Sequence, residues 1–434
     1  MLGLLYSIAD AGRELLRRTP GESTPAKAIL PLCHALLGSR GEASGTALAR
    51  DVTEAYRALS PAERLSFFRG LLEEFNVDGE RIVAAAEAYR ERRDLDSYLA
   101  LAAAVEPPRQ ELIRRINMAP RGTETIVAMR ADLLRLLDDH PELKAVDVDL
   151  RHLLAAWFNR GFLVLERIDW SSPAVILEKL IAYEAVHAMD GWDDLRRRLA
   201  ADRRCFAFFH PALPDEPLIF VEVALQRGMA AAIEPLLDRR TPVADVADAD
   251  TAVFYSISNC QTGLRGISFG NFLIKQVVLE LANEVPSLKR FVTLSPIPRF
   301  RGWLAQQLAA DDGAALSENE RAAARAVQDE SWAADEAVAE ALREPLLRLC
   351  ARYFLTARGG DGRPLDPVAR FHLGNGARLE RINWRGDMSP KALRESAGLL
   401  ANYLYDLKSI EKNHEAYAKS GKVTAASEVV KLAR

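Results

Sequence analysis

The sequence has little cysteine and no cluster of potential metal ligands. Its four cysteines are far apart along 434 residues, and no CxxC pair or neighbouring group of histidines accompanies them. Neither a zinc site of the usual spacing nor a disulfide framework is predicted, and a reducing compartment suits this composition. The cysteines are Cys33, Cys205, Cys260 and Cys350.

Long hydrophobic runs and a strong net charge are also missing. No apolar stretch approaches the roughly 20 residues that a helix needs to cross a bilayer. Residues 1–9 are mildly apolar, but Asp10, Arg13 and Glu14 follow too early for a signal peptide. The formal net charge of -4 provides no basic field for nucleic acid. We therefore expect a cytoplasmic protein that binds neither membranes nor nucleic acid.

The first part of the chain has the pattern of successive helices. Apolar residues recur at three- and four-residue spacing over 61–75, 78–92 and 107–117. Ser60-Pro61-Ala62-Glu63 is typical of a helix start, because Ser and Glu can satisfy each other's free amides and Pro61 needs no donor. The sequence predicts an all-helical domain over residues 1–157.

After Trp157 the composition changes to strands alternating with helices. Short runs rich in Val, Ile and aromatic residues predict strands, and helical patterns lie between them at 173–188 and 271–285. We predict a mixed α/β domain over residues 158–434, with an exposed helical excursion at about 305–345. The run Arg196-Arg197-Arg198 is interpreted as a solvated helix face. The strand runs are 206–209, 218–225, 252–258 and 291–295.

One strand–loop–helix unit has the composition of a phosphate-binding turn. The apolar run 254–258 is followed by a loop with Gly263, Gly266 and Gly270, and then by an amphipathic helix. Glycines let the backbone approach a ligand closely, and the helix offers its positive end to a pyrophosphate. Neither GxGxxG nor GxxxxGK[ST] is present, and a loop that only reverses the chain direction has the same pattern.

This loop resembles the coenzyme A-binding signature [QR]xxGxG of the acetyltransferase superfamily. Gly270 matches its second glycine, whereas Ser268 replaces the first. The resemblance implies that the segment, which we call the coenzyme A loop, holds the pyrophosphate of coenzyme A. Its predicted substrate-binding residues are Arg265, Gly266, Ile267, Ser268, Phe269, Gly270 and Asn271.

Longer stretches resemble the malonyl-CoA decarboxylase family. They are His210–Leu218, Thr293–Pro298, Asp366–Ala377 and Arg381–Trp384, in the order that the family has them. The resemblance implies an acetyltransferase-like catalytic domain that decarboxylates malonyl-CoA to acetyl-CoA and CO2. It also implies that no metal or prosthetic group is needed, since the thioester is itself the electron sink.

Ser295 and His372 are the predicted catalytic residues. Ser295 ends an apolar run, where α/β sheets commonly bind ligands, and His372 carries an imidazole that can hold a proton near neutral pH. A strand-ending hydroxyl and a structural histidine are the alternatives from the residues alone. The resemblance implies that Ser295 engages the malonyl group, that His372 donates the proton, and that Tyr405 supports them, although packing in a helix also explains Tyr405.

Several further assignments stay open from the sequence. Asp366 or Asp387 could orient His372, and Arg299 and Arg301 could reach the 3′-phosphate of coenzyme A. A coenzyme A-dependent N-acyltransferase is the alternative function, and a non-catalytic coenzyme A-binding protein is a third. We expect the helical domain to mediate formation of a homo-oligomer.

Overall fold

The computed structural model describes residues 25–39, 41–267, 273–310 and 316–434. The chain divides into two compact units, which we call the helical unit and the α/β unit. The helical unit comprises Met1–Leu163, His210–Pro214 and Gln261–Phe269, and the α/β unit comprises Val164–Phe209, Asp215–Cys260 and Gly270–Arg434.

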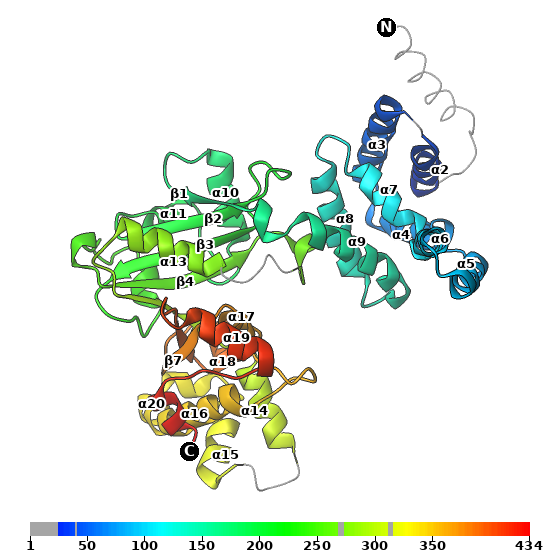
Figure 1. Cartoon of the computed structure of the whole chain (residues 1–434). Coiled ribbons are helices and arrows are strands. Elements are labelled where there is room, and N and C mark those ends of the chain that lie inside the picture. The colour runs from blue at the N-terminus through cyan, green and yellow to red at the C-terminus, as the bar shows by residue number, and fades with distance from the viewer. Residues whose placement is uncertain (1–24, 40, 268–272, 311–315) are drawn as a thin grey trace. The chain divides into compact units, whose positions relative to one another are not determined.

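The described part of the helical unit consists of α-helices joined by short turns (Figure 1). Its three predicted helices are confirmed to within one residue at each end. At the start of α4, the Ser60 hydroxyl accepts the N–H of Glu63, and the Glu63 carboxylate accepts the N–H of Ser60. The helices are α2 (Pro25–Gly38), α3 (Glu42–Arg57), α4 (Pro61–Glu74), α5 (Gly79–Arg92), α6 (Leu95–Val105), α7 (Pro108–Ile116), α8 (Gly122–Leu136) and α9 (Lys144–Trp157).

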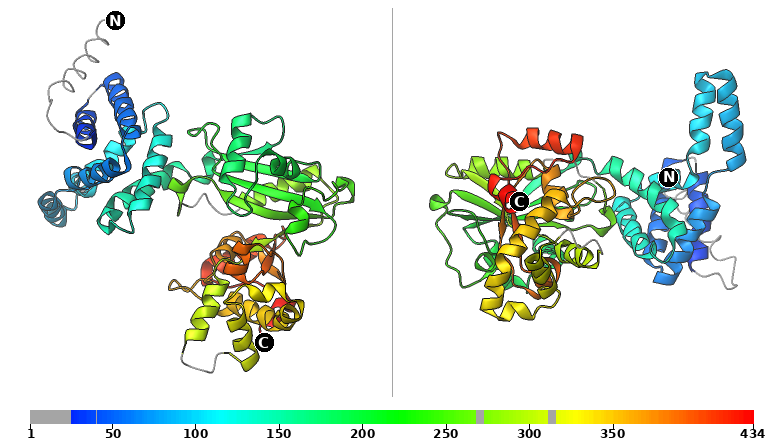
Figure 2. Two further views of the ribbon diagram at one scale, coloured as in Figure 1. Left: turned by 180° about the vertical axis from the view of Figure 1, so that it is seen from behind. Right: turned by 90° about the horizontal axis from the view of Figure 1, so that it is seen from below.

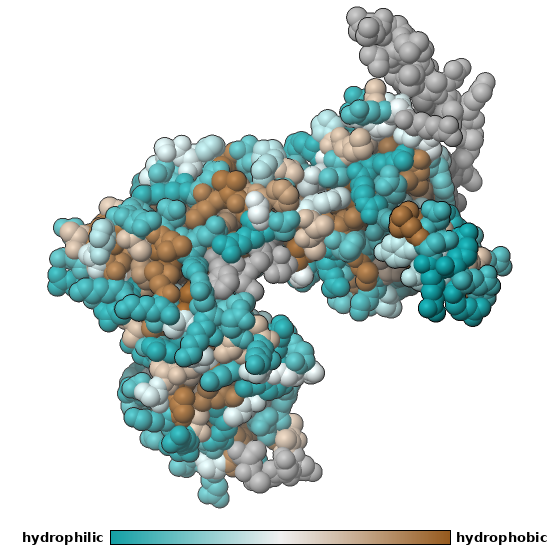
Figure 3. Space-filling view, viewed as in Figure 1, coloured by the Kyte–Doolittle hydropathy of each residue, from teal (hydrophilic) through white to brown (hydrophobic). Residues whose placement is uncertain are grey.

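Within this unit, α5 and α6 form a hairpin that contributes little to the core. None of the α5 residues is buried, and only Ser97 and Ala104 are buried in α6. The two helices lie side by side and extend beyond the other helices of the unit (Figure 2, right). Hydrophilic side chains cover most of α5 in the view of Figure 3.

The α/β unit is built on an eight-stranded sheet with the order β1-β2-β3-β4-β5-β8-β6, in which β7 also pairs with β8. All pairs are antiparallel except β4 and β5, which are parallel and are connected through α13 (Leu273–Glu284). The strands are β1 (Val164–Ile168), β2 (Arg203–Phe209), β3 (Ile219–Gln226), β4 (Thr251–Asn259), β5 (Arg290–Thr293), β6 (Ser295–Pro296), β7 (Arg378–Asn383) and β8 (Leu400–Leu404).

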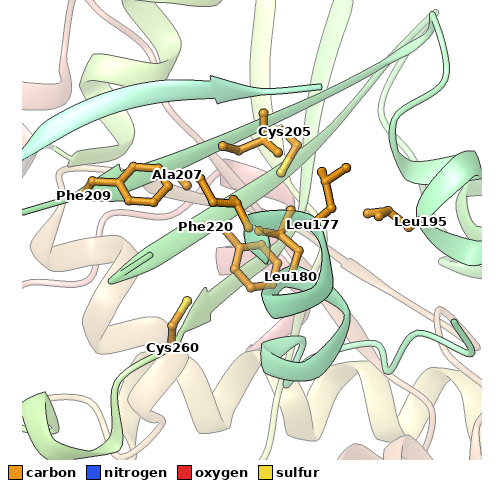
Figure 4. Close-up of a cluster of buried hydrophobic side chains, with 10 residues drawn as sticks. Leu177, Leu180, Leu195, Cys205, Ala207, Phe209, Phe220 and Cys260 are labelled. Carbon is orange, nitrogen blue, oxygen red and sulfur yellow. The ribbon is translucent and has the colours of Figure 1, made fainter. Parts of the chain in front are cut away.

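Two helices cover the β2–β3 region of this sheet. Leu177 and Leu180 of α10 (Ala174–Tyr183) and Leu195 of α11 (Trp192–Arg198) pack on Cys205 and Phe220, and all five are buried (Figure 4). Removal of this apolar surface from water stabilises the sheet by roughly 25 cal/mol for each Å² buried.

The interpretation of the arginine run of α11 as a solvated helix face holds for Arg196, which is exposed, and is wrong for Arg197 and Arg198. Arg197 and Arg198 are buried, with side chains only 5% exposed, and they pair with Asp202 and Glu222 at 2.7 and 2.6 Å. Glu222 lies on β3, 24 residues after Arg198 in the sequence. A run of charged residues does not reveal so distant a partner.

The C-terminal part of the chain adds helices to the sheet. The predicted exposed excursion is instead partly buried, because Trp332, Leu342 and Leu346 belong to the core. The side chains of Ser317 and Ser389 cap the N-termini of α15 and α18. The helices are α12 (Glu234–Leu237), α14 (Phe300–Ala309), α15 (Glu318–Ala326), α16 (Glu336–Thr356), α17 (Pro367–Gly374), α18 (Pro390–Ser396), α19 (Ile410–Ser420) and α20 (Ser427–Leu432).

Candidate active site

Ser295 lies where the sheet changes its pairing. Strand β5 ends at Thr293 after pairing with β8 through Val292 and Leu404, and Ser295 then starts β6 opposite Ala401. Side chains two residues apart on an extended strand point to the same side. This alternation brings the hydroxyl groups of Thr293 and Ser295 together, and Ser295 donates to Thr293 Oγ1 at 2.8 Å.

His372 is carried by the short helix α17, which is well defined at both ends. The Asp366 carboxylate caps it by accepting the N–H groups of Val368 and Ala369, both at 2.9 Å. Beyond the other end, Gly376 has φ +83°, and a Cβ there would lie 2.1 Å from the carbonyl oxygen of Ile410. The Asn–Gly pattern thus ends the helix just after His372 and lets the chain return as β7.

The three predicted catalytic side chains meet in the α/β unit. Ser295 Oγ lies 3.0 Å from His372 Nε2, and His372 Nδ1 lies 2.8 Å from the Tyr405 hydroxyl. The imidazole also stacks on Tyr403, with ring centroids 4.5 Å apart. We call Ser295, His372, Tyr405 and Thr293 the hydroxyl–imidazole network. A strand end, a helix and the end of another strand contribute to it.

The network is buried and carries no formal charge when the imidazole is neutral. His372 is only 2% exposed, and burial lowers its pKa to about 3. Burial likewise raises the pKa of Tyr405 well above 10. The arrangement therefore holds an uncharged imidazole between two hydroxyl groups, where an incoming negative charge would favour protonation of His372.

Two sequence interpretations concerning this network need correction. Tyr405 does not pack inside a helix; it directly follows β8. Asp366 caps α17 and accepts from the Tyr353 hydroxyl at 3.2 Å, while Asp387 accepts the N–H of Ser389. Neither carboxylate binds His372, and the group bonded to its Nδ1 is Tyr405.

Sequence reasoning missed Thr293 and Asn402. The side chain of Asn402 donates to the Thr293 carbonyl oxygen at 2.6 Å, and Thr293 Oγ1 accepts the N–H of Tyr403 at 3.2 Å. Both residues are fully buried. The spacing Thr293-x-Ser295 in an extended segment could have indicated that Thr293 lies beside Ser295. No local pattern in the sequence indicates Asn402.

The coenzyme A loop is described only in part. Ser268, Phe269, Gly270 and Asn271 lie outside the described residues. Arg265 and Gly266 are exposed, and Gly266 has φ +78° with open space at its Cβ position. The backbone N–H groups of Arg265 and Ile267 donate to the carbonyl oxygens of Thr262 and Leu264 at 3.0 Å.

The beginning of this loop packs within the helical unit. A Cβ at Gly263 would lie 1.9 Å from the carbonyl oxygen of Val127 on α8, so only glycine fits there. The buried Arg130 guanidinium donates to the carbonyl oxygens of Gly263 and Arg265 at 2.7 and 2.9 Å. Gly263 therefore serves packing on α8.

Arg301, which was considered for phosphate binding, and the nearby basic residue Lys275 of α13 have other partners. Arg301 donates to the carbonyl oxygens of Leu393 and Gln328 at 3.2 and 2.8 Å. Lys275, on α13, forms an ion pair with Glu411 at 2.6 Å. Arg301 thus has a structural role in the α/β unit.

The described residues include neither a membrane-spanning helix nor a cluster of metal-binding side chains. None of the described helices has the length and apolarity required to cross a membrane. No group of three or more His, Cys, Asp or Glu side chains in the described ranges is arranged to hold a metal ion.

Profiles of two protein domains match most of the chain. The malonyl-CoA decarboxylase C-terminal domain matches residues 161–434, and the malonyl-CoA decarboxylase N-terminal domain matches residues 75–158. Among curated relatives, the mitochondrial malonyl-CoA decarboxylase of Anser anser anser is 35% identical over 86% of this chain and 81% of its own. The mitochondrial enzyme of Rattus norvegicus is 34% identical over 98% of this chain and 91% of its own.

Solved structures agree with these matches. The malonyl-CoA decarboxylase of Rhodopseudomonas palustris superposes with a TM-score of 0.91, at 52% identity over 94% of this chain and 100% of that chain. The enzyme of Agrobacterium vitis superposes with a TM-score of 0.88 at the same identity and coverage. The predicted resemblance, the enzyme class and the helical plus mixed α/β fold class are confirmed. The chain belongs to the malonyl-CoA decarboxylase family.

Proposed function

We propose that this chain converts malonyl-CoA to acetyl-CoA and CO2 with Ser295 and His372 as its catalytic residues. The observation that carries the proposal is the 3.0 Å approach of Ser295 Oγ to His372 Nε2 in a buried environment. Membership of the family supplies the substrate class, and the pair supplies a hydrogen-bonding hydroxyl beside a group that can carry a proton.

The reaction consumes one proton, which His372 delivers. The bond between C2 and the carboxyl carbon breaks, and its electron pair enters the thioester to form an enolate while CO2 leaves. C2 then takes a proton from Nε2 of His372. In the free enzyme burial keeps the pKa of His372 at about 3, and the substrate carboxylate raises it by attracting the positive charge of the imidazolium.

Ser295 and Tyr405 hold the two reacting partners in position. The Ser295 hydroxyl engages the malonyl group beside Nε2, while the Tyr405 hydroxyl contacts Nδ1 at 2.8 Å and fixes the orientation of the ring. Such positioning lowers the entropic part of the barrier without any change in the chemistry. The thioester accepts the electron pair, so we propose that no metal or prosthetic group takes part.

Binding of the coenzyme A pyrophosphate by residues 265–271 is part of the same proposal. Arg265 is exposed and keeps its charge available, and the open position at Gly266 leaves space beside the backbone. Replacing Arg265 with Ala should raise KM for malonyl-CoA with little change in kcat, because the contact is made before and during the reaction alike.

Paired histidine variants test the catalytic proposal. His372→Gln should lower kcat by on the order of 10³-fold, since general acid catalysis contributes roughly that factor. Ser295→Ala should also lower kcat, because it removes the hydroxyl that positions the malonyl group. His414→Gln is the matched control, because His414 bonds the Gly374 carbonyl of the same helix α17 at 2.7 Å without touching Ser295. Its kcat should stay within about threefold of wild type.

Each protein is incubated separately with malonyl-CoA and with acetyl-CoA, with and without an amine. Release of CO2 from malonyl-CoA alone supports the proposal. Consumption of acetyl-CoA only when an amine is present, with malonyl-CoA untouched, would indicate an N-acyltransferase. Binding of both thioesters without turnover would indicate a non-catalytic protein, and full activity of His372→Gln would remove His372 from the mechanism.

We also propose that the helical unit mediates homo-oligomerisation and that the protein works in the cytoplasm. The hairpin of α5 and α6 exposes large apolar side chains, which a second copy could cover. All four cysteines are free, as expected in a reducing compartment. The names of the goose and rat relatives place those proteins in mitochondria, so fractionation of the native cells is the test of compartment. The exposed large apolar residues of this hairpin are Val83, Tyr89, Leu95, Tyr98, Leu99 and Val105.

A further inference from the structure

Thr293 occupies the point where the β5–β8 ladder gives way to the β6–β8 ladder. Only Val292 and Leu404 are paired in the first, and pairing resumes at Ser295 and Ala401 in the second. Between them the Thr293 side chain replaces a backbone acceptor, because its Oγ1 accepts the N–H of Tyr403. The same oxygen lies 2.8 Å from Ser295 Oγ.

These contacts determine where the protons of the network lie. A backbone N–H can only donate, so Thr293 Oγ1 is an acceptor toward Tyr403. The geometry also makes Ser295 the donor to Thr293, which turns the single Ser295 proton away from the imidazole. His372 Nε2, 3.0 Å from Ser295 Oγ, must then carry a hydrogen, and its Nδ1 accepts the proton of the Tyr405 hydroxyl.

We infer that Thr293 is a positioning residue that keeps the neutral His372 in its Nε2–H tautomer by holding the proton of Ser295. This inference rests on the proposed function, in which Nε2 delivers the proton to C2. With Nε2 already protonated, the imidazolium forms by proton uptake at Nδ1, on the Tyr405 side. If Ser295 instead donated to Nε2, the delivering nitrogen would carry no proton in the free enzyme.

Two substitutions distinguish the effect of the Thr293 hydroxyl from the effect of the shape of its side chain. Thr293→Val keeps the branched side chain and removes the acceptor, so Ser295 is free to donate to Nε2. Thr293→Ser keeps the acceptor and removes a methyl group. We expect kcat to fall on the order of 10²-fold in Thr293→Val, with KM nearly unchanged, and to stay within about fivefold of wild type in Thr293→Ser.

The decisive measurement is the tautomer of His372 in the full-length chain. Long-range ¹H–¹⁵N spectra of protein labelled at histidine report which ring nitrogen carries hydrogen, and the His372 signals are those lost in His372→Gln. We expect Nε2–H in wild type and Thr293→Ser, and Nδ1–H in Thr293→Val. If Thr293→Val does not fold, Thr293→Ala answers the same question because it also lacks the hydroxyl.

The spectra do not depend on turnover, so the positioning role of Thr293 and the proposed decarboxylase function can be refuted independently. An Nδ1–H signal in wild type, or an Nε2–H signal retained in the variant without the hydroxyl, overturns the role of Thr293 even if malonyl-CoA is decarboxylated. The expected tautomers in a protein that does not decarboxylate malonyl-CoA would uphold the positioning role and overturn the proposed function.

Discussion

The α/β unit buries two polar networks of opposite character. The hydroxyl–imidazole network joins Ser295, His372, Tyr405 and Thr293 without a formal charge. The second, which we call the ion-pair network, joins Arg198 at the end of α11 to Glu222 on β3 at 2.6 Å. One network therefore holds groups that can exchange protons, and the other holds groups that neutralise each other's charge.

The ion-pair network is built to stay fixed. Arg198 also donates to the carbonyl oxygen of His187 at 2.7 Å, and its guanidinium lies 5.9 Å from the ring centre of Tyr255. Burial raises the pKa of Glu222 to about 7, although Arg198 opposes this shift. A perturbed pKa alone thus does not mark a catalytic group, since both networks have one, and the connection to a movable proton distinguishes them.

Breaking the ion-pair network should have the largest effect on stability. Arg198→Met leaves Glu222 buried without its partner, which is expected to cost about 3–5 kcal/mol of the free energy of unfolding. The double variant Arg198→Met/Glu222→Gln should recover much of this loss, because no uncompensated charge remains. Urea denaturation measures both proteins, and a loss below about 1 kcal/mol in the single variant would contradict the fixed role of the pair.

The hydroxyl–imidazole network should instead make stability depend on pH. The pKa of His372 is about 3 when folded and about 6.5 when unfolded, so only the unfolded chain gains this proton between these values. Its contribution is present above pH 6.5 and is lost as the pH falls. From pH 7 to pH 5 wild type should lose about 2 kcal/mol more than His372→Gln.

The difference between the two proteins isolates His372 from other groups that titrate in this range. Glu222, whose pKa burial raises to about 7, also titrates in this range and acts with the opposite sign. Its effect is common to wild type and His372→Gln and cancels. Equal pH dependence in the two proteins would show that His372 is not buried in its neutral form.

Tyr405 and Tyr403 both contact His372, so the contribution of the Tyr405 hydroxyl can be tested against a matched control. Tyr405→Phe removes the hydroxyl that contacts Nδ1, and kcat should fall about tenfold, which corresponds to about 1.4 kcal/mol in the barrier. Tyr403→Phe is the control, since the Tyr403 ring stacks on His372 but its buried hydroxyl has no hydrogen-bond partner among the described residues. Equal kcat values for the two variants would show that the Tyr405 hydroxyl makes no contribution of its own to kcat.

The smallest effect on stability is expected outside both networks. Leu99 on α6 is 54% exposed, so Leu99→Lys should change the free energy of unfolding by less than about 0.5 kcal/mol. If the α5–α6 hairpin mediates self-association, the same change should lower the mass measured by light scattering. Ala43→Lys, on the exposed surface of α3, is the control, and an unchanged mass in Leu99→Lys would exclude the hairpin surface as the interface.

The sequence predicted the elements well where local patterns determine them. Ser60 and Glu63 form the expected capping box at the start of α4, and the strand–loop–helix order around Gly263 is as expected. The strands β1, β7 and β8 were missed. In β8 the run from Leu400 to Leu404 has no alternation of polar and apolar residues, because all but one of its residues are buried.

The candidate site was predicted residue by residue through family resemblance, whereas its geometry was not. No spacing in the sequence connects Ser295 with a histidine 77 residues away, or that histidine with Tyr405. The solvated face expected at Arg197 and Arg198 was wrong for the same reason, since the partner of Arg198 on α11 is Glu222 on strand β3.

By itself the sequence determined the bounds of several helices and the change from a helical region to a mixed α/β region, because caps and periodicity act over a few residues, and family resemblance supplied the candidate catalytic residues. Only the tertiary structure decided which hydroxyl faces Nε2, which faces Nδ1, and that Thr293 receives the proton of Ser295. These choices depend on how β6, α17 and β8 pack, and packing depends on contacts between residues that are distant along the chain.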